Sequence, residues 1–325
     1  MHLIKHYHEA GDAMKNLKKM LKKVPGKLLI GTALMAASFG VSAGVTYDFT
    51  STNTATITGA VGSATFSTNT QQPTGTGKIG SFVEVTGNNL VKQAYNTTVN
   101  GVYDNGSSDT FNHAIRVGNI GFIDNGSGVE VMRFLLDINQ QNKQGTLDNY
   151  LTLDEVQVYL SPTSNSNTAP NPLANFATLS LGTLLYQMDK DPTDNNILMD
   201  YNLNSGSGSG DIYMDITKEA FEKAFEALGV DLAADRNAYF IYLFSRFGGD
   251  DATKDGVTAK YGNNDGFEEW AAFTGTGFTD EECPKGSTDP DCVTPPNEAP
   301  EPATLAILGA GLFGMALARR RRNVR

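Results

Sequence analysis

Acidic side chains grouped in loops are the residues of this chain that come nearest to a chemical site. Carboxylate oxygens suit Ca²⁺, and acidic residues at alternate positions of a short loop are typical of calcium sites. The weak calcium candidates are Asp189, Asp191, Asp194, Asp251 and Asp255. Neither loop fits an EF-hand, because Asp194 stands where that loop needs glycine and Gly262 stands where the closing glutamate belongs. A looser calcium site and solvated turn residues both stay open, and we favour solvated turns.

Catalytic residues are scarce in this sequence. His113 is the one histidine after residue 43, and its place in an alternating segment is typical of a surface or core-edge residue. The Gly/Ser run 206–210 never places serine in the middle of Gly-x-Ser-x-Gly and has no phosphate-loop lysine, so we expect a flexible hairpin tip. Asp and Glu are plentiful, but no pair is singled out as the two carboxylates of a glycoside hydrolase. The sequence therefore predicts a protein that is not an enzyme.

Trp270 is the sole tryptophan, and two glutamates, Glu268 and Glu269, precede it. An aromatic ring beside acids can stack on a sugar, although a single tryptophan more often packs in a core. A carbohydrate-binding module would need an exposed aromatic platform, for which Tyr239, Tyr242 and Trp270 are the candidates.

The chain carries its basic charge mostly at its two ends. Of its 25 Lys and Arg residues, 12 lie in residues 1–43 and 319–325, whereas only two of its 36 Asp and Glu residues do. The part between therefore has 13 basic and 34 acidic residues, a net charge of −21. Such a body repels phosphate backbones, so nucleic acid is not an expected partner.

Short strands joined by polar turns dominate residues 44–274, which we predict to be one all-β body, a β-sandwich of jelly-roll type. The expected strands include 55–58, 81–85, 113–117, 129–138, 151–160, 176–187, 197–203, 211–216 and 238–246. In the 151–160 strand, alternation predicts one buried face with Val156, Val158 and Leu160, and one wet face with Gln157 and Tyr159.

One helix is expected in the body, at residues 218–228. Thr217 is its predicted N-cap and Gly229 its predicted terminator. Phe221, Phe225 and Leu228 fall on one side of it, which predicts an amphipathic helix packed on a sheet edge or barrel mouth.

Residues 1–43 have the layout of a secretory signal. A lysine-rich stretch precedes the 16-residue run Leu28–Ala43, which ends in small residues. That run is too short and too polar for a permanent membrane span, so we expect cleavage after Ala43. An uncleaved N-terminal anchor is the alternative.

The C-terminus has three features in order, which are a Pro-Glu-Pro motif, an apolar run and an arginine cluster. They are Pro300, Glu301 and Pro302, then the predicted transmembrane helix 303–318, then Arg319, Arg320, Arg321 and Arg322. A 16-residue helix rises about 24 Å, so it spans a bilayer of about 30 Å only with thinning or with arginines that reach up to the interface. The arginines should stay in the cytoplasm, which places the preceding body outside.

Residues 300–325 resemble the PEP-CTERM sorting signal. That resemblance implies an exported protein of Gram-negative bacteria that make exopolysaccharide, and an exosortase that processes the chain near Pro-Glu-Pro. The segments 194–211, 239–247 and 263–270 resemble a body domain of other PEP-CTERM proteins, which implies no activity. Between body and signal, residues 275–299 read as an extracytoplasmic tether, in which Cys283 and Cys292 are expected to form a disulfide.

These features predict an exported protein that is held first in the inner membrane by its C-terminal helix and then reaches the cell surface or the extracellular space. The favoured role is a non-enzymatic structural or adhesive component of the envelope or matrix. The first alternative is a carbohydrate-binding module acting on exopolysaccharide. A secreted hydrolase is disfavoured, because the histidine and nucleophile motifs are missing.

Overall fold

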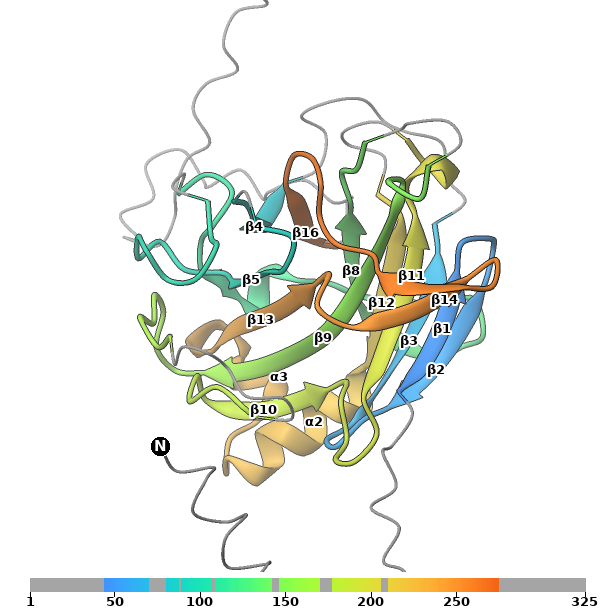
Figure 1. The fold of residues 1–325 in the computed structure, drawn as a ribbon. Coiled ribbons are helices and arrows are strands. Elements are labelled where there is room, and N and C mark those ends of the chain that lie inside the picture. The colour runs from blue at the N-terminus through green and yellow to red at the C-terminus, as the bar shows by residue number, and fades with distance from the viewer. Residues whose placement is uncertain are drawn as a thin grey trace, which may run out of the picture. The chain divides into compact units, whose positions relative to one another are not determined.

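The computed structural model describes residues 44–69, 80–87, 89–106, 109–141, 146–169, 177–205 and 210–274. These residues form mostly β-strands and few helices, so the expected β-rich body is confirmed, while its jelly-roll type stays a prediction (Figure 1). The predicted signal, tether, disulfide, sorting signal and most of the Gly/Ser run lie outside the described residues. Within the described part of the chain, no helix is long and apolar enough to span a bilayer.

The first large sheet, sheet A, has seven strands. They are β1 (Val45–Phe49), β5 (Lys92–Tyr95), β6 (Ile115–Arg116), β9 (Tyr150–Ser161), β10 (Thr183–Gln187), β11 (Asn195–Asp200) and β13 (Phe240–Phe247). Their order is β1-β11-β9-β13-β5, with β10 paired to β9 and β6 to β13. Only β1 and β11 run parallel; the other pairs in this sheet are antiparallel.

The second large sheet, sheet B, also has seven strands, and all of its pairs are antiparallel. They are β2 (Thr54–Thr58), β3 (Ser63–Thr68), β4 (Ser81–Val85), β7 (Phe122–Asp124), β8 (Glu130–Asp137), β12 (Ile212–Thr217) and β16 (Glu268–Ala272). Their order is β2-β3-β12-β8-β16-β4, with β7 paired to β8. A small hairpin joins β14 (Asp251–Lys254) to β15 (Val257–Lys260).

One hydrophobic core receives side chains from both large sheets. Alternate residues of each strand point inward, so Val156 and Val158 of β9 share the core with Phe134 of β8 and Met214 of β12. Trp270 of β16 is fully buried there, and its Nε1 donates a hydrogen bond to Ser245 Oγ at 3.1 Å. The expectation that this tryptophan packs in a core is therefore confirmed.

The outer face of β9 is buried too, so the predicted wet face is wrong. Gln157 and Tyr159 lie in the protein interior, and Tyr159 packs in a second cluster with Tyr95 and Tyr242. The loop after β9 covers them: the Tyr95 hydroxyl donates to the carbonyl of Thr168 at 2.9 Å, and the main-chain N–H of Leu179 donates to the Tyr159 hydroxyl at 2.8 Å. A strand alternation cannot show that a distant loop will cover its polar face.

Several strand ends differ from the expected ones for local reasons. β11 ends at Asp200 because the Asp200 side chain accepts a hydrogen bond from the main-chain N–H of Asn202, which starts the 3-10 turn η2 (Tyr201–Leu203). β6 is only two residues long, since the 3-10 turn η1 (Val117–Asn119) follows it. The strands β1, β3, β5, β7, β14, β15 and β16 were not among the expected strands.

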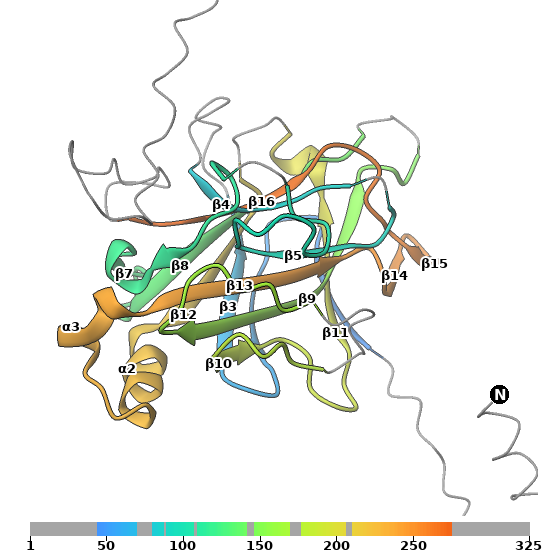
Figure 2. The same cartoon turned by 90° about the vertical axis from the view of Figure 1, so that its left-hand side faces the viewer.

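The helix α2 (Lys218–Ala227) confirms the prediction closely. The Thr217 hydroxyl accepts a hydrogen bond from the main-chain N–H of Ala220 at 3.3 Å, and Gly229 follows with a φ of 72°. Phe221 and Phe225 are fully buried. After it come α3 (Leu232–Asp235) and the 3-10 turn η3 (Arg236–Ala238), and α2 and α3 lie together at one end of the sheets (Figure 2).

We predict that Thr217→Ala lowers the free energy of unfolding by about 1 kcal/mol, because it removes the side-chain cap of α2. Thr217→Ser keeps the capping oxygen and should retain most of the stability. Chemical denaturation of the two variants measures this difference. Equal losses in both would show that the cap contributes nothing.

Candidate functional site

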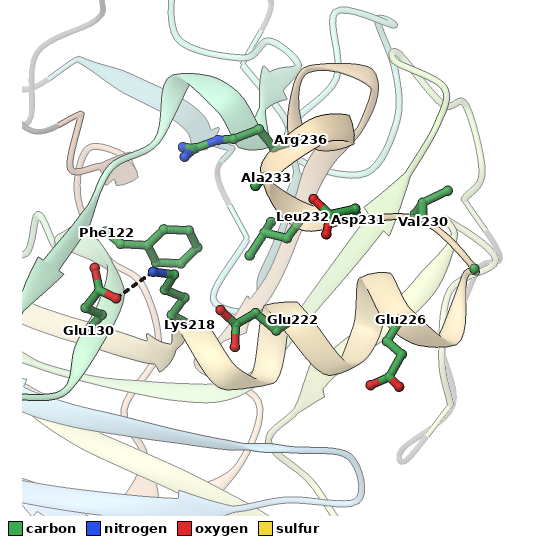
Figure 3. Close-up of a pocket in the computed structure, with 11 residues that line it drawn as sticks. Phe122, Glu130, Lys218, Glu222, Glu226, Val230, Asp231, Leu232, Ala233 and Arg236 are labelled. Carbon is green, nitrogen blue, oxygen red and sulfur yellow. Dashed lines mark hydrogen bonds and ion pairs between the residues drawn. The ribbon is translucent and has the colours of Figure 1, made fainter.

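A pocket of about 840 Å³ lies between α2, α3 and the start of β7 (Figure 3). No motif in the sequence pointed to it. It is lined by Phe122, Glu130, Lys218, Glu222, Glu226, Gly229, Val230, Asp231, Leu232, Ala233 and Arg236.

The helix α2 forms one wall of this pocket because an ion pair fixes its first residue to sheet B. Lys218 Nζ lies 2.5 Å from Glu130 Oε2, at the start of β8. The same ammonium lies 5.8 Å from the centre of the Phe122 ring, within cation–π range. Phe122 packs edge-on against Phe221 of α2, so the aromatic wall is attached to the core.

The opposite wall is held by Arg236, at the end of α3. Its guanidinium donates hydrogen bonds to the main-chain carbonyls of Val117 at 3.1 Å, Gly118 at 3.2 Å and Ile120 at 2.6 Å. The Asp231 carboxylate caps α3 by accepting from the main-chain N–H of Ala234 at 2.9 Å, and the main-chain N–H of Asp231 donates to Asp235 Oδ2 at 2.9 Å. An aspartate at an N-cap is a sequence signal that could have located the start of this wall.

The pocket combines apolar and charged side chains. Its lining has an aromatic ring, apolar side chains and charged groups of both signs, but no histidine, cysteine or serine. Glu222 points into the space beside Lys218 and Leu232, whereas Glu226 points away from it (Figure 3). Such a lining suits a small ligand that carries both apolar and hydrogen-bonding groups.

The carboxyl groups with strongly raised pKa values lie in the interior rather than in this pocket. At an irregularity in β9, Glu155 Oε1 accepts hydrogen bonds from the main-chain N–H groups of Val156 at 2.9 Å and Met188 at 3.0 Å. Burial raises the pKa of Glu155 to about 7. Burial, together with the nearby Glu155 carboxylate, raises the pKa of Asp189 to about 9, so the two carboxyls share a proton.

A guanidinium occupies the middle of a neighbouring acidic cluster. Arg246 Nη2 lies 3.2 Å from Asp250 Oδ1, and Arg246 Nε lies 3.9 Å from Oδ2 of the fully buried Asp154. The main-chain N–H of Gly249 donates to the same Asp154 oxygen at 2.5 Å. Burial raises the pKa of Asp154 to about 7. Arg246 thus supplies the positive charge of this cluster.

The predicted calcium candidates do not converge. Asp189 is buried and Asp194 is half-buried, whereas Asp191, Asp251 and Asp255 are exposed. Asp255 has a φ of 51° and forms the β14–β15 turn with Gly256. Across the described ranges, no group of three or more His, Cys, Asp or Glu side chains is arranged to hold a metal ion.

The residues proposed for a sugar platform are not brought together on a surface. Trp270 and Tyr242 are fully buried, and Tyr239 is half-buried against Phe225 with ring centres 5.1 Å apart. Their places in the core and in the loop-covered cluster contradict the predicted platform. The histidine His113 lies beside the edge strand β4, and its main-chain N–H donates a hydrogen bond to the Phe82 carbonyl at 3.2 Å.

The two glutamates beside Trp270 are structural. Glu268 is fully buried, accepts a hydrogen bond from the main-chain N–H of Asn139 at 2.8 Å, and has a pKa raised by burial to about 8. Burial raises the pKa of Glu269 to about 7, although the Ser81 hydroxyl donates to its carboxylate at 2.8 Å. Neither glutamate lines the pocket.

We predict that the body is most stable in acid and loses stability between about pH 5 and about pH 9. A carboxyl whose pKa is raised on folding binds its proton more tightly in the folded state, so its stabilisation is lost as pH rises toward the folded pKa. Chemical denaturation across this pH range measures the loss. Stability that stayed level or rose would contradict the prediction.

Asp189→Asn gives the sharper comparison, because an amide can donate to Glu155 permanently as the shared proton does. We expect this variant to lose less stability than the parent between about pH 7 and about pH 9. Asp191→Asn, on the exposed part of the same loop, removes a charge without touching the pair and should behave as the parent does.

Comparison with known proteins identifies one segment of this chain. Residues 298–322 match the family model of the PEP-CTERM protein-sorting motif. No curated protein matches the chain. The matched segment includes Pro300, Glu301, Pro302 and Arg319–Arg322, and it indicates an exported protein that an exosortase targets. The chain therefore carries a PEP-CTERM protein-sorting motif at its C-terminal end, after a β-rich body.

Proposed function

We propose that this exported protein is a non-enzymatic structural or adhesive component of the cell surface or extracellular matrix, with a β-sandwich body. The sorting motif at residues 298–322 carries the proposal, because it addresses the whole chain to an exosortase. In this scheme the helix 303–318 and the arginines hold the body at the inner membrane until the exosortase acts. The signal peptide is removed after Ala43.

The character of the body supports a structural role. Several of its carboxyl groups with raised pKa values, among them Asp154, Asp189 and Glu268, are buried among main-chain donors or beside Arg246, where a substrate has no access. Such groups hold loops and strands in place rather than exchange protons with a ligand. A net charge of −21 outside the two targeting ends suits a protein that must stay soluble once released.

We predict that Glu301→Ala with Pro302→Ala leaves the chain in the membrane fraction, with its C-terminal helix still attached. The parent should lose that helix and appear at the surface or in the medium. Mass spectrometry of the C-terminus in each fraction gives the readout, and a strain without exosortase should match the variant. Pro295→Ala, outside the matched motif, is the control. Equal processing of all three chains would refute the sorting proposal.

A second candidate function is carbohydrate binding in the pocket between α2 and α3. The observation that favours it is the Phe122 ring beside Glu222 and Lys218, since sugars stack on aromatic faces and hydrogen-bond to charged groups. The pocket is thus a different candidate sugar site from the predicted aromatic platform, whose Trp270 and Tyr242 are buried.

We predict that Ala233→Trp fills the pocket and abolishes retention of the protein on exopolysaccharide from its own host. Ala233 is exposed and lines the pocket, so the larger ring should occupy it without disturbing the core. Ala234→Trp, at the next exposed position and outside the lining, should bind as the parent does. Affinity electrophoresis measures retention, and equal retention of the two variants would exclude this pocket.

A further inference from the structure

The edge of sheet B at β2 lacks the usual protection against strand addition. Strands at sheet edges expose unpaired N–H and C=O groups, which natural proteins blunt with charges, proline, bulges or covering loops. Along their main strand orders, the two large sheets end at β1 and β5, and at β2 and β4, while β6, β7 and β10 each pair with a single strand beside these orders. These four edges differ in how they are protected.

One loop covers two of the four edges. The Asp104 carboxylate accepts from the main-chain N–H of Gln93 in β5 at 3.0 Å, and the Asp104 N–H donates to the Gln93 carbonyl at 3.0 Å. In β4, the Glu84 carbonyl accepts from the Gly106 N–H at 3.1 Å, and the Glu84 N–H donates to Asn112 Oδ1 at 3.0 Å. Both edges are therefore closed to another strand.

The edge at β1 is protected by charge. Asp48 lies in this strand, its main-chain carbonyl accepts from the Asn53 side chain at 2.7 Å, and its carboxylate lies 3.5 Å from Lys254. A second strand would have to displace these contacts and accommodate the charge.

The edge at β2 has no comparable protection. Its sequence, Thr-Ala-Thr-Ile-Thr, contains no charge, proline or glycine, and its three threonines are exposed. The main-chain hydrogen bonds from Thr68 to Asn53 and from Gly59 to Gly62 fix which residues face β3. By the alternation of antiparallel pairs, the main-chain groups of Thr54, Thr56 and Thr58 point away from the sheet.

The threonine side chains leave most of that open edge uncovered. The hydroxyls of Thr56 and Thr65 lie 2.9 Å apart, and those of Thr58 and Ser63 also lie 2.9 Å apart, so both are tied back to β3. Only the Thr54 N–H is capped locally, by Asn53 Oδ1 at 2.8 Å.

We propose that β2 pairs with β2 of a second copy of this chain, antiparallel and two-fold symmetric about Thr56. The strand is self-complementary in that register: Thr56 meets Thr56, Thr54 meets Thr58, and small Ala55 meets large Ile57 on the core side. No like charges oppose each other. The two B sheets become one continuous sheet across the pair.

Chains tethered or crowded at a surface favour this pairing. A five-residue edge contact is small compared with a stable interface, so the pair is weak in dilute solution. High local concentration compensates for that weakness. The inference concerns the body alone and holds whether or not an exosortase processes the chain.

Cysteine cross-linking of the full-length chain in its own host tests this register. Opposed residues of a hydrogen-bonded antiparallel pair have Cα atoms about 5.5 Å apart, within the range that a disulfide spans. We predict that Thr56→Cys gives a disulfide-linked dimer on mild oxidation, seen by non-reducing electrophoresis and lost on reduction. Thr65→Cys, opposite Thr56 on β3 and on the same face, should give no more dimer than the parent, which already contains Cys283 and Cys292.

A second pair of cysteine variants tests which residues of the two β2 strands lie opposite each other. Thr54→Cys and Thr58→Cys chains should cross-link when expressed together and not when either is expressed alone. Adding Thr56→Lys to both should abolish that cross-link, because two ammonium groups then face each other across the axis. Equal cross-linking at positions 56 and 65, or a cross-link that survives Thr56→Lys in both chains, would overturn the proposal. The oxidant is added to the cell fraction that contains the chain. Failed export changes the fraction in which the chain is found, whereas failed pairing removes the cross-linked dimer from that fraction.

Discussion

Burial of the central strand β9 on both of its faces is the constraint on which the rest of this body depends. Its inner face supplies Val156 and Val158 to the core between the sheets, and its outer face is covered by loops. Strands buried in this way must satisfy every polar group internally. Glu155 contributes to this where β9 is irregular, because its carboxylate accepts a hydrogen bond from the main-chain N–H of Val156. The Met188 N–H, just after β10, is shared between the Glu155 carboxylate and the Val156 carbonyl.

The same constraint explains why acidic residues are numerous inside the body. Asp154, Asp189 and Glu268 are each buried with main-chain donors, and burial raises the pKa of each. The stability of the body therefore depends on the protonation of these carboxyl groups, since a carboxylate without its proton is poorly solvated in the interior. Beside Asp154, the positive charge of Arg246 offsets part of the cost of burying that carboxylate.

Local signals in the sequence predicted local structure well. The cap at Thr217 and the glycine at position 229 placed α2 within a residue, because both act on the adjoining main chain. The Asp255-Gly256 pair is an equally local turn signal, and it marks a hairpin that was not predicted. Features that join distant segments stayed hidden: the loop over Tyr159, the burial of Tyr242, and the pocket that Phe122 shares with Arg236. These three features depend on which distant segments come together in the fold. The spacing of apolar residues along the sequence does not show that.

The loop that closes both β4 and β5 limits how far the molecule can assemble. A sheet with two free edges can take up a neighbour on each side and grow into a filament, whereas a sheet with one free edge is finished after a single addition. In sheet B, the Gly106 N–H and the Asn112 side chain occupy the main-chain groups of Glu84 in β4, so a third copy cannot add at β4. Pairing at β2 therefore cannot extend into a fibre that grows through β2 and β4.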